Sequence, residues 1–128
     1  MSLLQIVKSI FSSNKKDLES QRTAQESMEQ IRSRMDILNQ KAFNLKDNYP
    51  EEKNQIAELF ELVNTIEPSP SVRAGKFEWA LGQAITRVSS ACDKVFTSLN
   101  KDELDAEIAL LSKAVRERQN ADMEEDDE

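Results

Sequence analysis

Carboxylates are plentiful in this sequence, and two pairs of them, together with its one cysteine, are the candidates for an acid, a base or a nucleophile. Glu58 and Glu61 lie three residues apart, Asp102 and Glu103 are adjacent, and Cys92 is the single cysteine. Paired carboxylates support acid–base chemistry when their surroundings separate their pKa values. Both pairs fall on a polar helical face or at an expected helix start, where solvated carboxylates are ordinary. We therefore assign no catalytic residue to them.

Cys92 continues an apolar repeat, four residues after Val88 and three before Val95. Apolar surroundings raise the pKa of a thiol and shield it from reagents. The spacing therefore predicts a buried, structural cysteine. A lone cysteine cannot form an internal disulfide, which favours a reducing, cytoplasmic location.

Histidine is absent from the sequence, and this absence removes most metal and nucleophile sites. Ferritin-like di-iron sites, zinc-protease helices, Ser-His-Asp triads and Cys-His pairs all require it. The two glycines, Gly75 and Gly82, fall inside an expected helix, so no phosphate-binding loop is predicted. We expect a protein that is not an enzyme and has no cofactor and no metal site.

The apolar spacing places these residues on helices. From Ala24 to Leu45 apolar residues recur at alternating spacings of 4 and 3, a heptad pattern that predicts a helix over residues 18–47. Prolines and turn residues interrupt the pattern near residue 50 and in the EPSPS segment at 67–71. Asn100, followed three residues later by Glu103, resembles a capping box that starts another helix. The further helices are expected over residues 50–66, 72–99 and 100–119.

These patterns predict an all-α fold with four main helices in an antiparallel bundle. A short amphipathic N-terminal helix, residues 1–13, precedes the bundle domain, residues 18–119, and a disordered acidic tail, residues 120–128, follows it. The polar residues between the short helix and the bundle are expected to form a hinge. Gly75, Gly82 and Ser89, which are seven residues apart, either admit a neighbouring helix closely or are merely tolerated.

The segment SLLQIVKSIF, residues 2–11, has an apolar arc of roughly 160° on a helix. It is too short to span a bilayer and lacks the features of a signal peptide. The arc must be covered by the rest of the chain, a second copy, another protein or a lipid surface. The interaction residues assigned to it are Leu3, Leu4, Ile6, Val7, Ile10 and Phe11.

Trp79 is the other candidate interaction residue, because it falls off the apolar repeat of the third expected helix. An exposed aromatic side chain can mark a partner site. The alternative is that Trp79 packs beneath the opening helix or the 67–71 segment.

The net charge of −7 is unevenly distributed along the chain. Residues 1–16 carry three lysines and no acid, whereas residues 119–128 carry six acids and no base. An acidic balance opposes binding to phosphate backbones, so we expect no nucleic-acid partner.

An interaction or scaffold role is the function that these features favour. The expected partner is another protein or a second copy of the chain. The alternative is a peripheral membrane-associated module, in which the N-terminal helix is the anchor and Lys8, Lys15 and Lys16 face anionic lipid. Only weak contact with a membrane surface is expected from three lysines and one short helix.

Overall fold

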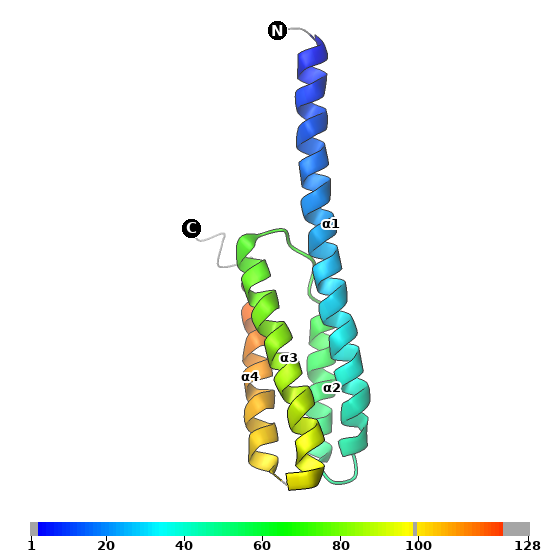
Figure 1. Ribbon diagram of the computed structural model, residues 1–128, viewed down its shortest axis with the longest axis vertical. Helices are drawn as coiled ribbons and strands as arrows, with labels where there is room; N and C mark the ends of the chain where they lie inside the picture. The colour runs from blue at the N-terminus through cyan, green and yellow to red at the C-terminus, as the bar shows by residue number, and fades with distance from the viewer. Residues whose placement is uncertain (1–2, 99, 122–128) are drawn as a thin grey trace.

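The computed structural model describes the backbone of residues 3–98 and 100–121, and the side chains of residues 18–98 and 100–121. Within these ranges the chain is helical and contains no strand. The predicted all-α bundle of four main helices is confirmed (Figure 1). The elements are α1 (Leu3–Ala42), the short 3₁₀ helix η1 (Phe43–Leu45), α2 (Pro50–Asn64), α3 (Val72–Ser98) and α4 (Lys101–Gln119).

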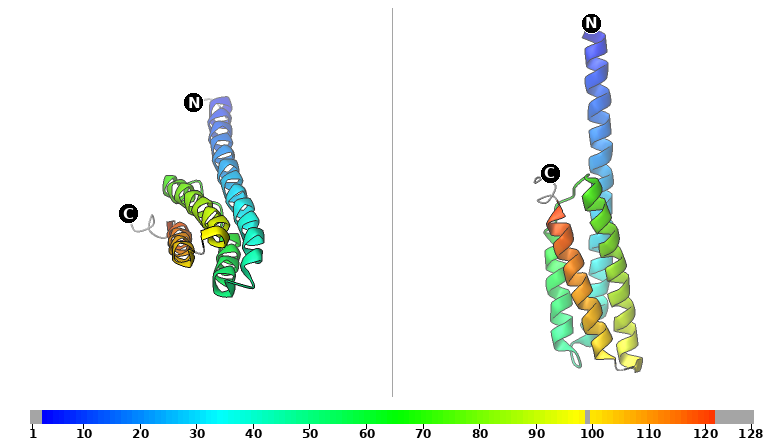
Figure 2. Two further views of the ribbon diagram at one scale, coloured as in Figure 1. Left: turned by 60° about the horizontal axis from the view of Figure 1, so that its bottom comes forward. Right: turned by 90° about the vertical axis from the view of Figure 1, so that its left-hand side faces the viewer.

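Consecutive helices run antiparallel, as predicted, but the bundle is built from two hairpins laid side by side. α1 packs beside α2 and α3, and α4 packs beside α2 and α3 (Figure 2). Contacts between α1 and α3 advance in step, from Ser27 with Glu78 to Lys41 with Asp93, so these two neighbours are parallel. The segment after α2 therefore crosses the end of the bundle to reach α3.

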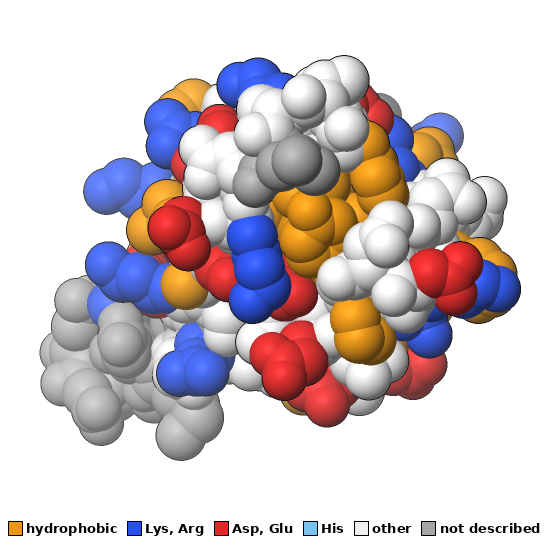
Figure 3. All heavy atoms as spheres, turned by 90° about the horizontal axis from the view of Figure 1, so that it is seen from below, with side chains coloured by type: hydrophobic (Ala, Val, Ile, Leu, Met, Phe, Trp, Pro, Cys, Tyr) orange, Lys and Arg blue, Asp and Glu red, His pale blue; other side chains and the backbone are white. Residues whose placement is uncertain are grey.

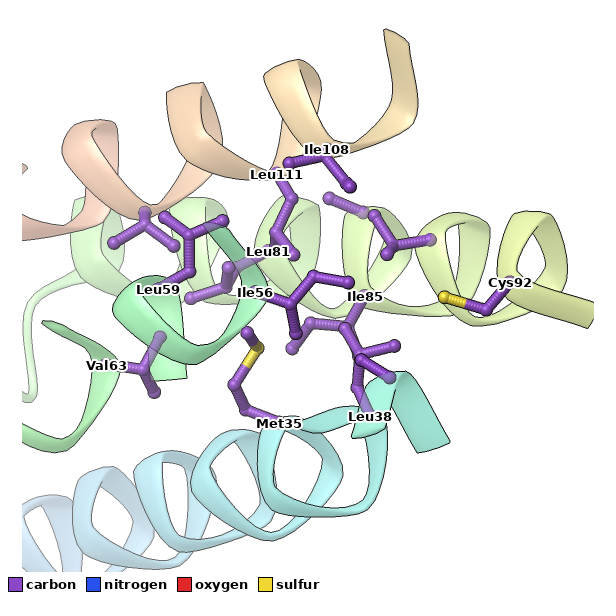
Figure 4. Close-up of a cluster of buried hydrophobic side chains, with 14 of the residues drawn as sticks. Met35, Leu38, Ile56, Leu59, Val63, Leu81, Ile85, Cys92, Ile108 and Leu111 are labelled. Atoms are coloured by element: carbon purple, nitrogen blue, oxygen red, sulfur yellow. The ribbon is translucent and has the colours of Figure 1, made fainter. Parts of the chain in front are cut away.

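The hydrophobic core is formed by one apolar face from each helix. All seven positions of the heptad pattern in residues 24–45 are buried, which confirms that prediction. Figure 4 shows side chains of the four helices meeting in the centre, with Met35 of α1, Ile56 of α2, Ile85 of α3 and Leu111 of α4 among them. Burying each such side chain contributes roughly 1.5–3 kcal/mol before chain entropy is subtracted.

The helix ends have the local chemistry that the sequence indicates. Pro50 begins α2, where its missing N–H removes no hydrogen bond. Ser71 accepts a bond from the backbone N–H of Ala74 (3.0 Å) at the start of α3. The predicted cap of α4 is also present, since the backbone N–H of Glu103 donates to Oδ1 of Asn100 (3.1 Å).

The predicted separate N-terminal helix and its hinge are wrong. α1 continues without a break from Leu3 to Ala42, a length of about 60 Å at 1.5 Å per residue. The hinge was predicted from polarity alone, and the sequence SSNKKD contains neither glycine nor proline to stop a helix.

The N-terminal part of α1 extends beyond the bundle in every ribbon view (Figures 1 and 2). The backbone of this segment is therefore not folded back over its own bundle. The side chains of the six apolar residues assigned to it lie outside the described residues, as do residues 122–128 of the predicted disordered tail. Asn120 and Ala121, which the prediction placed in that tail, are described, and Ala121 is buried.

Cys92 is buried on α3 as predicted, and burial raises the pKa of its thiol to about 11. We therefore expect a thiol reagent to label the native protein far more slowly than a urea-unfolded control at pH 8. Cys92→Ser should lower the free energy of unfolding by roughly 1–3 kcal/mol, because it places a hydroxyl in an apolar site. Equal labelling rates in the folded and unfolded chains would contradict the burial of this thiol.

Candidate interaction surface

A buried ion pair fixes the end of the bundle from which α1 projects. Arg118 of α4 is 1% exposed, and its Nε donates to Oε2 of Glu78 on α3 (2.8 Å). Ser27 of α1 donates to the other carboxylate oxygen. Nη2 of Arg118 donates to the backbone carbonyl of Glu67 (2.9 Å), in the segment between α2 and α3. Three helices and one connection thus meet at a single charge pair.

The sequence contained an indication that this pair is buried, but charged residues are ordinarily interpreted as surface residues. Glu78 lies three residues before Leu81 and Arg118 three residues after Val115, so both continue the apolar spacing of their helices. Glu52 does the same on α2, four residues before Ile56, and is also buried. A charged residue at a core position of a heptad pattern was therefore the available indication of a buried charge.

Arg32 and Arg34 of α1 make contacts within the molecule. Nη2 of Arg32 donates to the backbone carbonyl of Ile66 (2.6 Å), next to the connection that Arg118 also holds. Nη2 of Arg34 donates to the carbonyl of Gly82 (2.9 Å), and a Cβ at Gly82 would lie 2.7 Å from Nη1 of Arg34. A side chain at Gly82 would therefore displace the end of the Arg34 side chain, whereas a Cβ at Gly75 would meet no atom within 4 Å.

Trp79 is 71% exposed on the outer side of α3, so the alternative that it packs beneath α1 or the 67–71 segment is wrong. It lines a shallow groove of about 300 Å³ between α3 and α4. We name this the Trp79 groove and define it by Phe77, Trp79 and Arg87 of α3 and Leu110, Lys113 and Glu117 of α4. Leu110, across the groove on α4, is 47% exposed.

The other exposed aromatic side chains have partners within the molecule. Phe96 makes an edge-to-face contact with Tyr49 (6.2 Å between ring centroids), and the Lys46 ammonium lies 4.4 Å from the ring centre of Phe43. These contacts lie at the opposite end of the bundle, where hydrophobic side chains are visible between charged ones (Figure 3). Among the described residues, Trp79 is the exposed aromatic side chain with neither a ring contact nor a cation above it.

The surface around the Trp79 groove is basic, although the chain is acidic. Between residues 72 and 92 the one acid is Glu78, which is buried, whereas Arg73, Lys76 and Arg87 are at least partly exposed. Lys113 adds a further cation across the groove, with Glu117 3.8 Å away. The groove therefore combines an unpartnered aromatic ring with an excess of positive charge.

The two sets of predicted interaction residues are not brought together. Trp79 lies beside the bundled part of α1, near Gln30 and Arg34, whereas residues 3–11 are in the part of α1 that extends beyond the bundle (Figure 1). They nevertheless belong to the same end of the molecule, because α3 begins and α1 leaves the bundle there.

The two carboxylate pairs, to which no catalytic role was assigned, do not lie in an enclosed site. Glu58, Glu61 and Asp102 are exposed, and Glu103 takes part in the cap of α4. A groove between α2 and α4 is lined by four acids, Glu51, Glu52, Glu58 and Asp105. Even so, the described residues contain no group of three potential ligands placed to hold a metal ion.

No protein-family model, no curated protein and no solved structure matches this chain. Within the described residues, no helix has the length and hydrophobicity needed to cross a membrane.

Arg118→Met should lower the free energy of unfolding by about 3–5 kcal/mol, because it leaves the Glu78 carboxylate buried without its partner. The matched control is Arg116→Met, two residues away and exposed, which should change stability by no more than about 0.5 kcal/mol. Urea unfolding measures both. Combining Arg118→Met with Glu78→Leu should recover most of the loss, and equal effects of the two single arginine variants would contradict the role assigned to this pair.

Glu52→Gln should raise the melting temperature at pH 7. Burial raises the pKa of Glu52, and Asp105 raises it further, while Lys101 lowers it. The folded state therefore binds a proton more readily than the unfolded state, and stability falls as pH rises through the pKa. The gain should shrink below about pH 4.3, the ordinary glutamate pKa, where both states are protonated. The exposed Glu51→Gln control should show no such pH-dependent gain, and the same gain in both variants would contradict this assignment.

Proposed function

We propose that this chain is a non-enzymatic protein-interaction module, a helical bundle that binds another protein or a second copy of itself. The observation that carries the proposal is the Trp79 groove, in which a tryptophan is 71% exposed beside the exposed Leu110. Tryptophan is enriched among the residues that dominate binding energy at protein interfaces.

The size of the ring makes Trp79 a suitable anchor. An aromatic side chain removes on the order of 150–250 Å² from water when it is fully buried. In the free protein most of this gain is unused, because the ring lies in the open groove. A partner that covers Trp79 and Leu110 together would gain from both side chains without rearranging the core.

The projecting part of α1 supports the same proposal. Six large apolar residues occupy one arc of its sequence, and no described helix lies beside its backbone (Figures 1 and 2). Each such side chain gains roughly 1.5–3 kcal/mol on burial, so the arc favours association with an apolar surface. A second copy presents an identical arc and is one partner that satisfies this requirement.

A peripheral membrane role is the alternative that the same segment raises. Lys8, Lys15 and Lys16 accompany the apolar arc, and each contributes about 1 kcal/mol near an anionic leaflet. The acidic remainder of the chain opposes this attraction. We therefore rank association with protein above association with lipid.

Deleting residues 1–13 tests the order of these proposals. Sedimentation should show that the intact chain self-associates. The deletion should lower the number of chains in the assembly or lower the melting temperature. Binding of the intact chain to anionic liposomes should be weak. An unchanged oligomeric state and an unchanged melting temperature, together with the loss of strong liposome binding, would support the membrane alternative instead.

Trp79→Ala tests the groove separately from α1. This change should alter the free energy of unfolding by no more than about 0.5 kcal/mol, the range of a surface substitution, because the ring is exposed. It should weaken association with a protein partner, whereas Ile37→Ala, a comparably exposed apolar residue on α1, should not. Equal effects of the two substitutions on binding would argue against a specific role of the groove.

A further inference from the structure

We propose that the acidic residues 122–128 of this chain bind back onto its own Trp79 groove and cover Trp79. The inference rests on the proposed function in one respect, since it makes these residues a competitor of any partner at the groove. Its own basis is position, charge and composition.

Position places the start of this segment beside the groove. Arg118 contacts Glu78, the residue before Trp79, so Trp79 lies at the level of the last turn of α4. Ala121, three residues after Arg118, is buried against the bundle. The segment therefore departs from the structure close to Trp79.

The length of the segment matches the groove. From Gln119 back to Leu110, α4 spans about 14 Å at 1.5 Å per residue. Seven extended residues reach about 23 Å at about 3.3 Å each. Residues 122–128 can thus turn back and follow the groove to Arg87, which lines it together with Leu110.

The charge of residues 122–128 favours the Trp79 groove over the neighbouring groove between α2 and α4. The segment carries six acids and no base, while the exposed charges of α3 from residue 72 to residue 92 are all basic. Lys113 faces the same groove from α4 beside Glu117, so with Arg87 the charged residues that line the groove leave one net positive charge. By contrast, the neighbouring groove between α2 and α4 is lined by four acids, Glu51, Glu52, Glu58 and Asp105, and one cation, Arg116, so its excess of negative charge repels an acidic segment.

Composition supplies an apolar contact as well. Met123 is the one hydrophobic residue among residues 122–128, and it lies five residues after Arg118. A methionine thioether packs favourably against aromatic rings. We place Met123 against Trp79 and Leu110, with the acids that follow it directed to Lys113 and Arg87.

The strength of this contact is limited but sufficient because the segment is tethered. Exposed ion pairs are individually weak, so the separated segment should bind with a dissociation constant of only about 1 mM. A short tether gives an effective concentration that is also about millimolar. The groove should then be covered in roughly half of the molecules at low salt.

Fluorescence tests this directly, because Trp79 is the single tryptophan of the chain. Acrylamide quenching of the intact chain is compared with that of a chain shortened after Ala121. The quenching constant should rise roughly 1.5- to 2-fold on shortening, as expected for half coverage. The difference should vanish in 1 M NaCl, where the Debye length is about 3 Å.

Two further variants guard against indirect effects of shortening. Replacing the five acids from Glu124 to Glu128 by their amides keeps the length and should reproduce the shortened chain. In the intact chain, Arg87→Glu with Lys113→Glu should do the same. Lys46→Glu with Lys94→Glu, a control of equal charge at the opposite end of the bundle, should retain the protection of Trp79.

Each outcome decides the inference. Equal quenching of the intact and shortened chains at low salt would overturn it, and would do so whether or not a partner binds the groove. Protection that grows with protein concentration would also overturn it, by assigning the cover to a second copy. Protection independent of concentration and abolished by the charge variants supports binding within one molecule, even if no other partner exists.

Discussion

The buried pair of Glu78 and Arg118 is the interaction on which the end of this bundle depends. Removing two charges from water is costly, and the arrangement tolerates it because Ser27 and the carbonyl of Glu67 complete the hydrogen bonds. Such a pair contributes little net stability compared with apolar residues, but it permits one arrangement of α3, α4 and the 65–71 connection. The pair joins α3 to α4 within one hairpin, and its bonds to Ser27 and to the carbonyl of Glu67 tie that hairpin to α1 and to the connection.

The same pair determines that Trp79 is exposed. Successive residues on a helix are about 100° apart, so when Glu78 points inward to Arg118 its neighbour is turned toward the surface. Leu81 and Ala74 occupy the same inner face as Glu78 and are fully buried. Moving Trp79 into the core would require expelling the carboxylate that orders this end of the bundle.

The sequence predicted the helices and their apolar faces well, because a heptad pattern is a local property that survives folding. It failed where one residue's role depends on a distant partner. Glu78 and Arg118 are 40 residues apart, and although each continues the apolar spacing of its own helix, that spacing does not show that the two side chains meet. The hinge at residues 12–17 failed for a different reason, since polar residues reduce burial without interrupting a helix. Whether Trp79 is exposed could not be decided from the sequence, because the sequence does not give the position of α1 relative to α3.

The arrangement concentrates its open surfaces at one end. α1 leaves the bundle there, α3 begins there, and α4 ends beside Trp79 (Figure 1). A partner that contacted both the projecting α1 and the Trp79 groove would bind at two linked sites, and the second contact would form at a high effective concentration. The proposed binding of residues 122–128 in the Trp79 groove would remove one of the two sites. Salt-sensitive cover in about half of the molecules would then weaken the groove contact, and with it the combined affinity, about twofold.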